Sequence, residues 1–480
     1  MALNAGLKLS PSVNATSGQD AVIGHILEET AQGRSMVGAP ETEVLPFWIN
    51  LIARVGSGEY AYGPNSITAT EQGYHAMETS RRHVLSTHMM LGLVIMAAGF
   101  FQFWPAFRRR HRKAHRWIGS AYVLAALASM SMSAYFLVRT GVDETFNGFV
   151  FYAGLWFLLV LSVVSIGVAL WAIRRGDVAA HLGWQALAFG CFLSAPIQRT
   201  LWVAMTPWAG TASFNEMNIA VNVGLFALCF SAGYLVFVVN RASAPLRRVP
   251  AASRAAWLSS VRIQVRVGVG VLIVALWALA AWLYLVAEGL AGSAFTRELA
   301  PAAAVVAHDT ALGALAPWVV VAAMALFAGV SAKVLLATPA DAVLSPTKFA
   351  LLALSGGALA LLYVRWGLSL GMPSHALSVA GVFYAALGAL LMVFVALVGY
   401  GMRRGCLDQV REWLWFAIGL ALAPGLLYGQ FALLRLSGLI PDGYAHHGYQ
   451  IAAAVALSLP IIAGHLLAVY SPRTRRHALS

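Results

Sequence analysis

The sequence predicts an all-α, polytopic membrane protein, a helical bundle of about eleven transmembrane helices in two parallel tandem repeats. Of its 480 residues, 60% are hydrophobic and 11% are charged, and the mean hydropathy is +0.73. A soluble domain carries about 25% charged residues, so lipid must cover most of this surface. The apolar runs, roughly 20 to 28 residues long, can cross a hydrocarbon core of about 30 Å as helices.

The apolar runs define the expected spans. A shorter run, Val44–Val55, cannot span and contains Asn50 and Arg54, so it predicts an interfacial or re-entrant segment. We expect four regions: 1–82 outside the membrane, a first membrane unit at 83–240, a basic linker at 241–260 and a second unit at 261–480. The expected spans are 84–107, 115–138, 149–173, 180–205, 217–240, 261–287, 303–337, 347–368, 375–401, 410–437 and 446–470.

The positive charge of the chain is gathered in short loops. A formal net charge of +13 on a soluble protein would indicate nucleic acid, but here the basic residues lie between apolar runs. The positive-inside rule places such loops in the cytoplasm. We therefore expect a lipid bilayer and no nucleic acid as partner, and a multi-pass protein of the bacterial inner membrane with a cytoplasmic C-terminus. The basic clusters are Arg108–Arg116, Arg174–Arg175, Arg241–Arg266, Arg403–Arg411 and Arg473–Arg476.

Short motifs recur in the same order in both halves of the chain. Six matches have offsets between 220 and 231 residues, and 403 − 174 and 413 − 184 both equal 229. Recurrence in order at a nearly constant offset predicts a duplication, and one span joining the copies makes them parallel rather than inverted. The clearest matches are Arg174-Arg175-Gly176 with Arg403-Arg404-Gly405, Trp184 with Trp413, and Pro196 with Pro424.

Two histidines stand at the inner ends of different expected spans. His115 opens the second span and His181 opens the fourth. Two imidazoles at similar depth on two helices can hold a haem iron or another metal. They can also be interfacial residues that meet lipid phosphates. The second span holds no further histidine, so the pattern predicts at most one inner haem b.

Two ionisable residues lie near the outer ends of the spans. An ionisable group within a membrane is costly and therefore suggests a function. We expect His88 to act as a proton or ligand group and Arg199 to hold an anionic head, which makes both candidates for a catalytic role. Three interpretations of Arg199 are open. Its side chain can contact an anion or quinone, pair with a haem propionate, or snorkel to the membrane interface.

The stretch from His88 to Trp202 resembles the bacterial membrane family catalogued as domain of unknown function 2306. The resemblance implies that His88, His115, His181 and Arg199 act as a set, and it implies no particular reaction. The second half resembles a diverged copy without these histidines. The residues that carry the resemblance are His88 with Gly92, Gln102, His115-Arg116, Gly119, Tyr122, Arg175-Gly176-Asp177, His181, Trp184 and Arg199.

These residues lead to three hypotheses of function. In the first, the protein is a redox protein that binds haem b or a metal through His115 and His181 and exchanges electrons with a quinone or another membrane redox subunit. In the second, it is a transporter whose parallel repeats move about a midplane site, although the sequence displays no clearly broken helix pair and no midplane carboxylate. In the third, it is an accessory subunit of a membrane complex.

The topology can be tested by cysteine labelling. We expect a membrane-impermeant thiol reagent to label Asp143→Cys from outside and Asp177→Cys only from inside, because the basic loop at 174–179 is placed in the cytoplasm. Each variant is treated with the reagent in intact and in permeabilised cells, and Asp177→Cys should react only after permeabilisation. The reverse pattern would overturn the assigned orientation.

Overall fold

A computed structural model of the protein describes residues 19–142, 148–208, 214–241, 323–324, 326–331, 334–335, 346–371, 379–403, 407–439 and 445–470. All regular structure in these ranges is helical, which confirms the all-α class. The chain divides into two compact units, chiefly Met1–Pro245 and Leu246–Pro373 with Ser378–Ser480. The expected span 261–287 and most of 303–337 lie outside the described residues.

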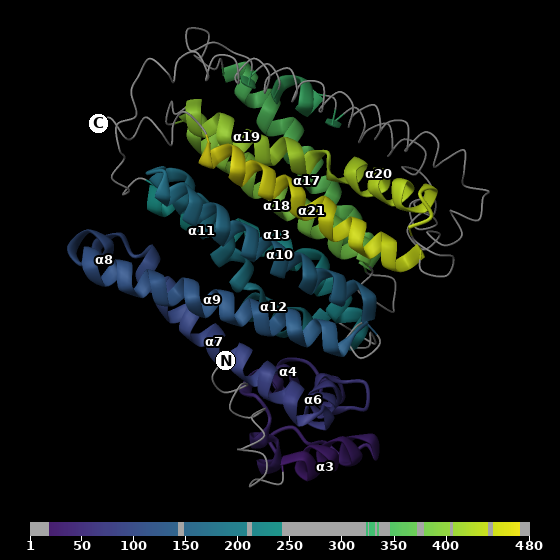
Figure 1. Ribbon diagram of the computed structural model, residues 1–480. Helices are drawn as coiled ribbons and strands as arrows, with labels where there is room; N and C mark the ends of the chain where they lie inside the picture. Colours follow the sequence, from purple (N-terminus) through teal and green to yellow (C-terminus); the bar gives the residue numbers. More distant parts are fainter. Residues whose placement is uncertain are drawn as a thin grey trace. The chain divides into compact units, whose positions relative to one another are not determined.

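The first unit contains the helices that correspond to the first five expected spans (Figure 1). α7 packs along α9, α10 packs along α11, and α13 packs against both α11 and α12. Thr79–Phe103, Arg112–Thr140, Gly148–Arg174 and Met217–Arg241 are long and apolar enough to span a membrane. The helices are α7 (Thr79–Phe103), α8 (Pro105–Arg110), α9 (Arg112–Thr140), α10 (Gly148–Arg174), α11 (Val178–Phe192), α12 (Ser194–Met205), η2 (Thr206–Trp208) and α13 (Phe214–Arg241).

The expected span at 180–205 is a broken helix rather than a continuous one. α11 and α12 meet at Leu193 with a bend of 46°. Pro196 stands in the first turn of α12, where its missing N–H and its ring prevent a regular helix from continuing through the preceding turn. The bend redirects the chain before Gln198, Arg199 and Trp202.

The second unit contains a helix pair broken in the same way. α19 and α20 bend by 52° at Leu422, which lies 229 residues after Leu193 (422 − 193). Both breaks are followed by a proline in the first turn of the next helix: Pro196 is the third residue of α12, and Pro424 is the second residue of α20. This parallel agrees with the proposed duplication, which stays a prediction. The helices are α17 (Pro346–Gly371), α18 (Val379–Arg403), α19 (Leu407–Ala421), α20 (Ala423–Leu436) and α21 (Ala445–Val469).

The described residues contain six helices suited to crossing a membrane, or up to eight if each bent pair is one span. The first and second units thus form a multi-pass membrane protein. The count of about eleven stays a prediction, because two of the expected spans lie mainly outside the described ranges. α17 covers the expected span 347–368, and its apolar portion, Ala350–Arg365, is shorter than the other spans.

Close contact between α11 and α13 depends on two glycines. A Cβ on Gly190 would lie 2.6 Å from the carbonyl oxygen of Cys229, and a Cβ on Gly233 would lie 2.7 Å from that of Ala186. Small residues let helix backbones approach closely in membranes. In the second unit Gly419, 229 residues after Gly190 (419 − 190), packs equally tightly, since its Cβ would lie 2.7 Å from Pro460.

The N-terminal region forms a folded helical cap rather than a free tail. α4, at nine residues, is too short to span. One of its faces buries Trp48, Ile49 and Ile52 against Trp202 and Phe214 of the membrane helices. Its other face exposes Phe47, Leu51 and Val55, the spacing that suits contact with a membrane surface. The N-terminal cap, residues 19–76, consists of α3 (Gln19–Ala31), η1 (Pro40–Val44), α4 (Phe47–Val55), α5 (Gly58–Tyr62) and α6 (Ile67–Ala76).

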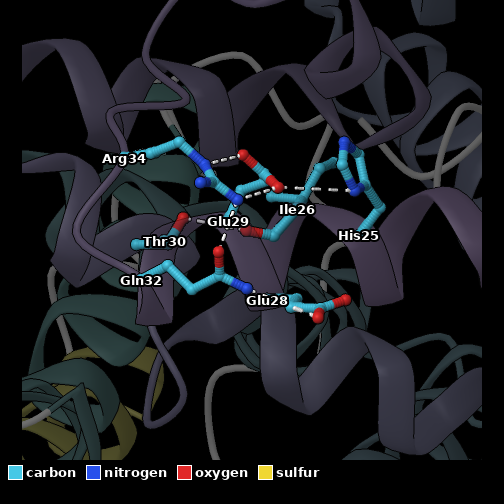
Figure 2. A network of polar contacts seen from close by, with 7 residues as sticks. All are labelled: His25, Ile26, Glu28, Glu29, Thr30, Gln32 and Arg34. Carbon is cyan, nitrogen blue, oxygen red and sulfur yellow. Dashed lines mark hydrogen bonds and ion pairs between the residues drawn. The ribbon is translucent and has the colours of Figure 1, made fainter.

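A polar network closes the end of α3 in this cap (Figure 2). The Arg34 guanidinium donates to both carboxylate oxygens of Glu29 and also to the side-chain oxygen of Gln32. This arrangement ties the residues after the helix back to its last turns. The Arg34 side chain lowers the pKa of the Glu29 carboxyl, but the pair is exposed to solvent and contributes little to stability.

We expect Gly190→Ala to destabilise the protein by about 1 to 3 kcal/mol, because the added methyl group must push α11 away from α13. Gly167→Ala is the matched control, since Gly167 lies in α10 with nothing within 4 Å of its Cβ position. The control should be neutral or slightly stabilising. Thermal unfolding in detergent measures both, and equal melting temperatures would contradict the close approach.

Candidate functional site

His181 is held in one tautomer by a bond to the neighbouring helix. Asp177 caps α11 by accepting a hydrogen bond from the backbone N–H of Ala180 at 3.0 Å, which places His181 in the first turn. The Nδ1 atom of His181 lies 3.0 Å from the carbonyl oxygen of Ala169 in α10. A carbonyl only accepts, so Nδ1 carries the proton and Nε2 keeps its lone pair. Histidines that ligate metals are oriented in the same way.

His115 lies beside His181 from the first turn of α9. The two rings are close enough for the charge on one to act on the other. The Nδ1 atom of His115 is buried and has no hydrogen-bond partner in the part of the chain that the structure describes. Its backbone oxygen accepts a hydrogen bond from Gln102 Nε2 at 3.0 Å, which ties α9 to α7. The structure therefore brings together the two histidines that the sequence placed on different spans.

A half-buried cation accompanies this histidine pair. Arg108, in α8, acts electrostatically on both imidazoles. Its Nη1 atom lies 3.5 Å from the side-chain oxygen of Asn240 in α13. Burial lowers the pKa of the Arg108 guanidinium, and the neighbouring Arg109 acts in the same direction. An anionic group that entered here would therefore meet a partly desolvated positive charge.

Polar atoms near the pair lack protein partners. Tyr122, Ser165 and Gln185 are buried, and their side-chain oxygens have no hydrogen-bond partner among the described residues. Gln185 stands one turn after His181, and Ser165 stands one turn before Ala169 on the facing helix. Buried groups of this kind usually bind ordered water. The sequence analysis missed Ser165 and gave Gln185 no role; their signal was a polar residue inside an apolar span.

His88 connects α7 to α9 near the middle of these helices. Its Nδ1 atom lies 3.0 Å from the backbone oxygen of Ser129 and 2.9 Å from the hydroxyl oxygen of the same residue. Ser129 is buried and His88 is half-buried. Because Nδ1 can donate to the carbonyl or accept from the hydroxyl, the ring is anchored in either tautomer.

Arg199 has different neighbours, and most of them come from the N-terminal cap. The Arg199 Cζ atom lies 5.4 Å from the ring centroid of Trp48 in α4 and 5.8 Å from that of Trp202. Glu71 and Tyr74 of α6 are close enough to interact with it electrostatically. No contact described by the structure joins Arg199 to His88, and the catalytic roles expected for these two residues stay predictions.

A cluster of buried amides lies between α12 and α13. Gln198 Nε2 donates to the side-chain oxygen of Asn218 at 3.2 Å and to that of Asn222 at 3.0 Å. Trp202 Nε1 donates to the same Asn218 oxygen at 2.7 Å. These four side chains are each at most 6% exposed. The sequence analysis did not single out this cluster, because an amide scattered through an apolar run has no spacing that marks it.

The donor set limits which metal group the inner pair can hold. In the described ranges no group of three or more His, Cys, Asp and Glu side chains is placed to hold a metal ion. Two imidazoles from different helices match the axial ligands of a haem iron, which takes its other four ligands from the porphyrin. The Nε2 atom of His181 and the unpartnered Nδ1 atom of His115 are the nitrogen atoms that a metal group bound at this pair would meet.

The fold and its spans define a multi-pass integral membrane protein built from helices. Residues 85–239, which run from α7 into α13, match the family described as "Predicted membrane protein (DUF2306)". The chain thus carries a DUF2306 membrane domain, and the resemblance found in the sequence is confirmed. No curated protein and no solved structure matches the chain.

We expect Gln198→Leu to destabilise the first unit by about 1 to 3 kcal/mol, because it leaves buried amide oxygens of Asn218 and Asn222 with fewer donors. Thr200→Ser is a suitable control, since Thr200 is exposed on the same helix. Thermal unfolding of the purified proteins would measure the difference. A variant as stable as the wild type would show that the cluster is not a structural contact between α12 and α13.

Proposed function

We propose that the DUF2306 domain is a membrane redox domain in which His115 and His181 hold one haem b between α9 and α11. The observation that carries this proposal is the bond from His181 Nδ1 to the carbonyl of Ala169, 3.0 Å long, beside a second imidazole. That bond leaves Nε2 as the available ligand and fixes the plane of the ring. A haem bound there supplies reversible one-electron transfer.

The residues around the histidine pair offer apolar contacts, a positive charge and polar groups, all of which a haem would need. The apolar cluster between α7, α9, α10 and α11 offers walls for a flat hydrophobic ring system. Arg108 would hold the carboxylate side groups of a bound porphyrin, because a partly desolvated guanidinium interacts strongly with carboxylates. Ordered water at Tyr122, Ser165 and Gln185 would offer a path for protons that balance the charge of the transferred electron.

The partner in this proposal is a quinone or another membrane redox subunit. His88, near the middle of α7, carries a ring proton in either tautomer. Arg199 offers a cation between aromatic rings, which suits the oxygen atoms of a quinone or an anionic head. The domain would lie in the bacterial inner membrane, with the histidine pair and the C-terminus on the cytoplasmic side, as the distribution of arginines favours.

A transporter is the second candidate, and one observation favours it. The sequence offered no clearly broken helix pair, but the structure has two, bent by 46° and 52°. Broken helices in corresponding positions of two repeats are typical of transporter sites. The breaks can equally serve to turn the chain toward the N-terminal cap, so the histidine pair carries the first proposal.

An optical spectrum of the purified full chain, oxidised and dithionite-reduced, tests the haem proposal. We expect a Soret band and sharp reduced α and β bands, lost or strongly reduced in His115→Ala and in His181→Ala. His83→Ala is the matched control, because His83 is exposed on α7, and His446→Ala should also leave the spectrum unchanged. Pyridine haemochrome and iron analysis would quantify the haem per chain.

Three results would count against the proposal. A colourless protein, expressed with haem supplied and free of iron, would exclude haem b and favour the transporter. Spectra unchanged by both alanine variants would mean that other residues ligate the iron. A loss of haem in His83→Ala equal to that in His181→Ala would show that unfolding, rather than ligation, explains the effect.

A further inference from the structure

We propose that the N-terminal cap and the bent helix α12 enclose a second site, separate from the histidine pair, for a ligand with oxygen acceptors on an apolar body. The site consists of Trp48, Arg199, Asn218 and Asn222. Its ligand is a carbonyl- or carboxylate-headed lipid. This inference does not depend on haem, because none of its residues belongs to the inner pair.

The orientation of the amides follows from their partners. Trp202 Nε1 only donates, so the Asn218 atom at 2.7 Å must be the oxygen. The same oxygen faces Gln198 at 3.2 Å, which makes the Gln198 atom a nitrogen. That nitrogen lies 3.0 Å from Asn222, so Asn222 also presents its oxygen to the cluster. The amide nitrogens of Asn218 and Asn222 consequently point away from these bonds.

The site then holds more donors than acceptors. The Nδ2 atoms of Asn218 and Asn222 and the Nε1 atom of Trp48 are buried and have no hydrogen-bond partner among the described residues. Asn218 is 0% exposed and Trp48 is 3% exposed. A buried donor without an acceptor costs about 1 to 3 kcal/mol. Three such donors beside a guanidinium favour a ligand that brings acceptors.

Ring contacts connect these donors in space. The Trp48 and Trp202 ring centroids are 5.3 Å apart, and Arg199 Cζ lies within 5.8 Å of both. Trp202 in turn donates to Asn218. Trp48 of α4 and Arg199 of α12 therefore adjoin the Trp202 ring that bonds to Asn218, and Gln198 of α12 links Asn218 to Asn222.

The apolar residues around the site indicate that the body of the ligand is apolar. Trp48 and Trp202 belong to a buried apolar cluster with Ile49, Phe214 and Met217. A small hydrophilic solute would leave this surface without apolar contact, whereas a lipid buries a chain or ring against it. Glu71 acts on Arg199 and offsets part of its charge, so a neutral carbonyl and a carboxylate both remain compatible with the donors.

Equilibrium binding of two probes to the full chain in detergent tests the site. Radiolabelled palmitate presents a carboxylate, and decylubiquinone presents carbonyls. Trp48→Phe removes one donor and keeps an aromatic ring, and we expect it to weaken binding about fivefold. Asn222→Asp replaces a donor by an acceptor of the same shape and should weaken binding at least tenfold. Trp117→Phe is the matched control, because Trp117 is 79% exposed on α9.

Saturable binding of palmitate alone would identify a carboxylate head, and saturable binding of decylubiquinone alone would identify a carbonyl head. Either result supports the site if Trp48→Phe weakens binding and keeps the wild-type melting temperature. Binding of neither probe would overturn the proposed site, and so would equal affinities of wild type, Trp48→Phe and Asn222→Asp. The unpaired donors would then bind ordered water. Repeating the measurement in His181→Ala separates this result from the fate of the haem proposal.

Discussion

Lipid offers no hydrogen bonds, so every polar group within the bundle must find a partner in the protein or in trapped water. This constraint explains why buried polar side chains of the first unit form hydrogen bonds between helices. His88 bonds to Ser129, Gln102 to the backbone of His115, and His181 to the backbone of Ala169. Each bond joins two helices, and each restricts how a histidine can be presented. The candidate site is therefore part of what holds the bundle together.

The same constraint makes the breaks at Leu193 and Leu422 informative. A helix interrupted within a membrane leaves backbone groups that must be satisfied nearby, and Pro196 and Pro424 stand where these interruptions occur. In the first unit the helix after the bend places Gln198 in the amide cluster and packs Trp202 against the N-terminal cap. Local chain geometry thus creates the donor-rich site, and the glycines Gly190 and Gly233 hold the straight part of the pair against α13.

Much of the fold could be predicted from the sequence. The expected spans 84–107, 115–138, 149–173 and 217–240 correspond to α7, α9, α10 and α13, since long apolar runs have one stable form in lipid. His115 and His181 lie in the first turns of α9 and α11, as expected from their place at the start of two predicted spans. The break in 180–205 was not predicted, although Pro196 was visible, because a proline in a membrane helix can be accommodated by a kink or by a complete interruption.

By itself the sequence determined that the protein crosses the membrane several times and that the candidate histidines lie in its first half. Composition and hydropathy suffice for this, because they measure transfer into lipid residue by residue. Only the tertiary structure decided that Arg199 faces Trp48 of the cap, and that Asn218 and Asn222 leave donors unpaired. Such contacts join residues far apart in the chain, and no local pattern records which side chains will meet when helices pack.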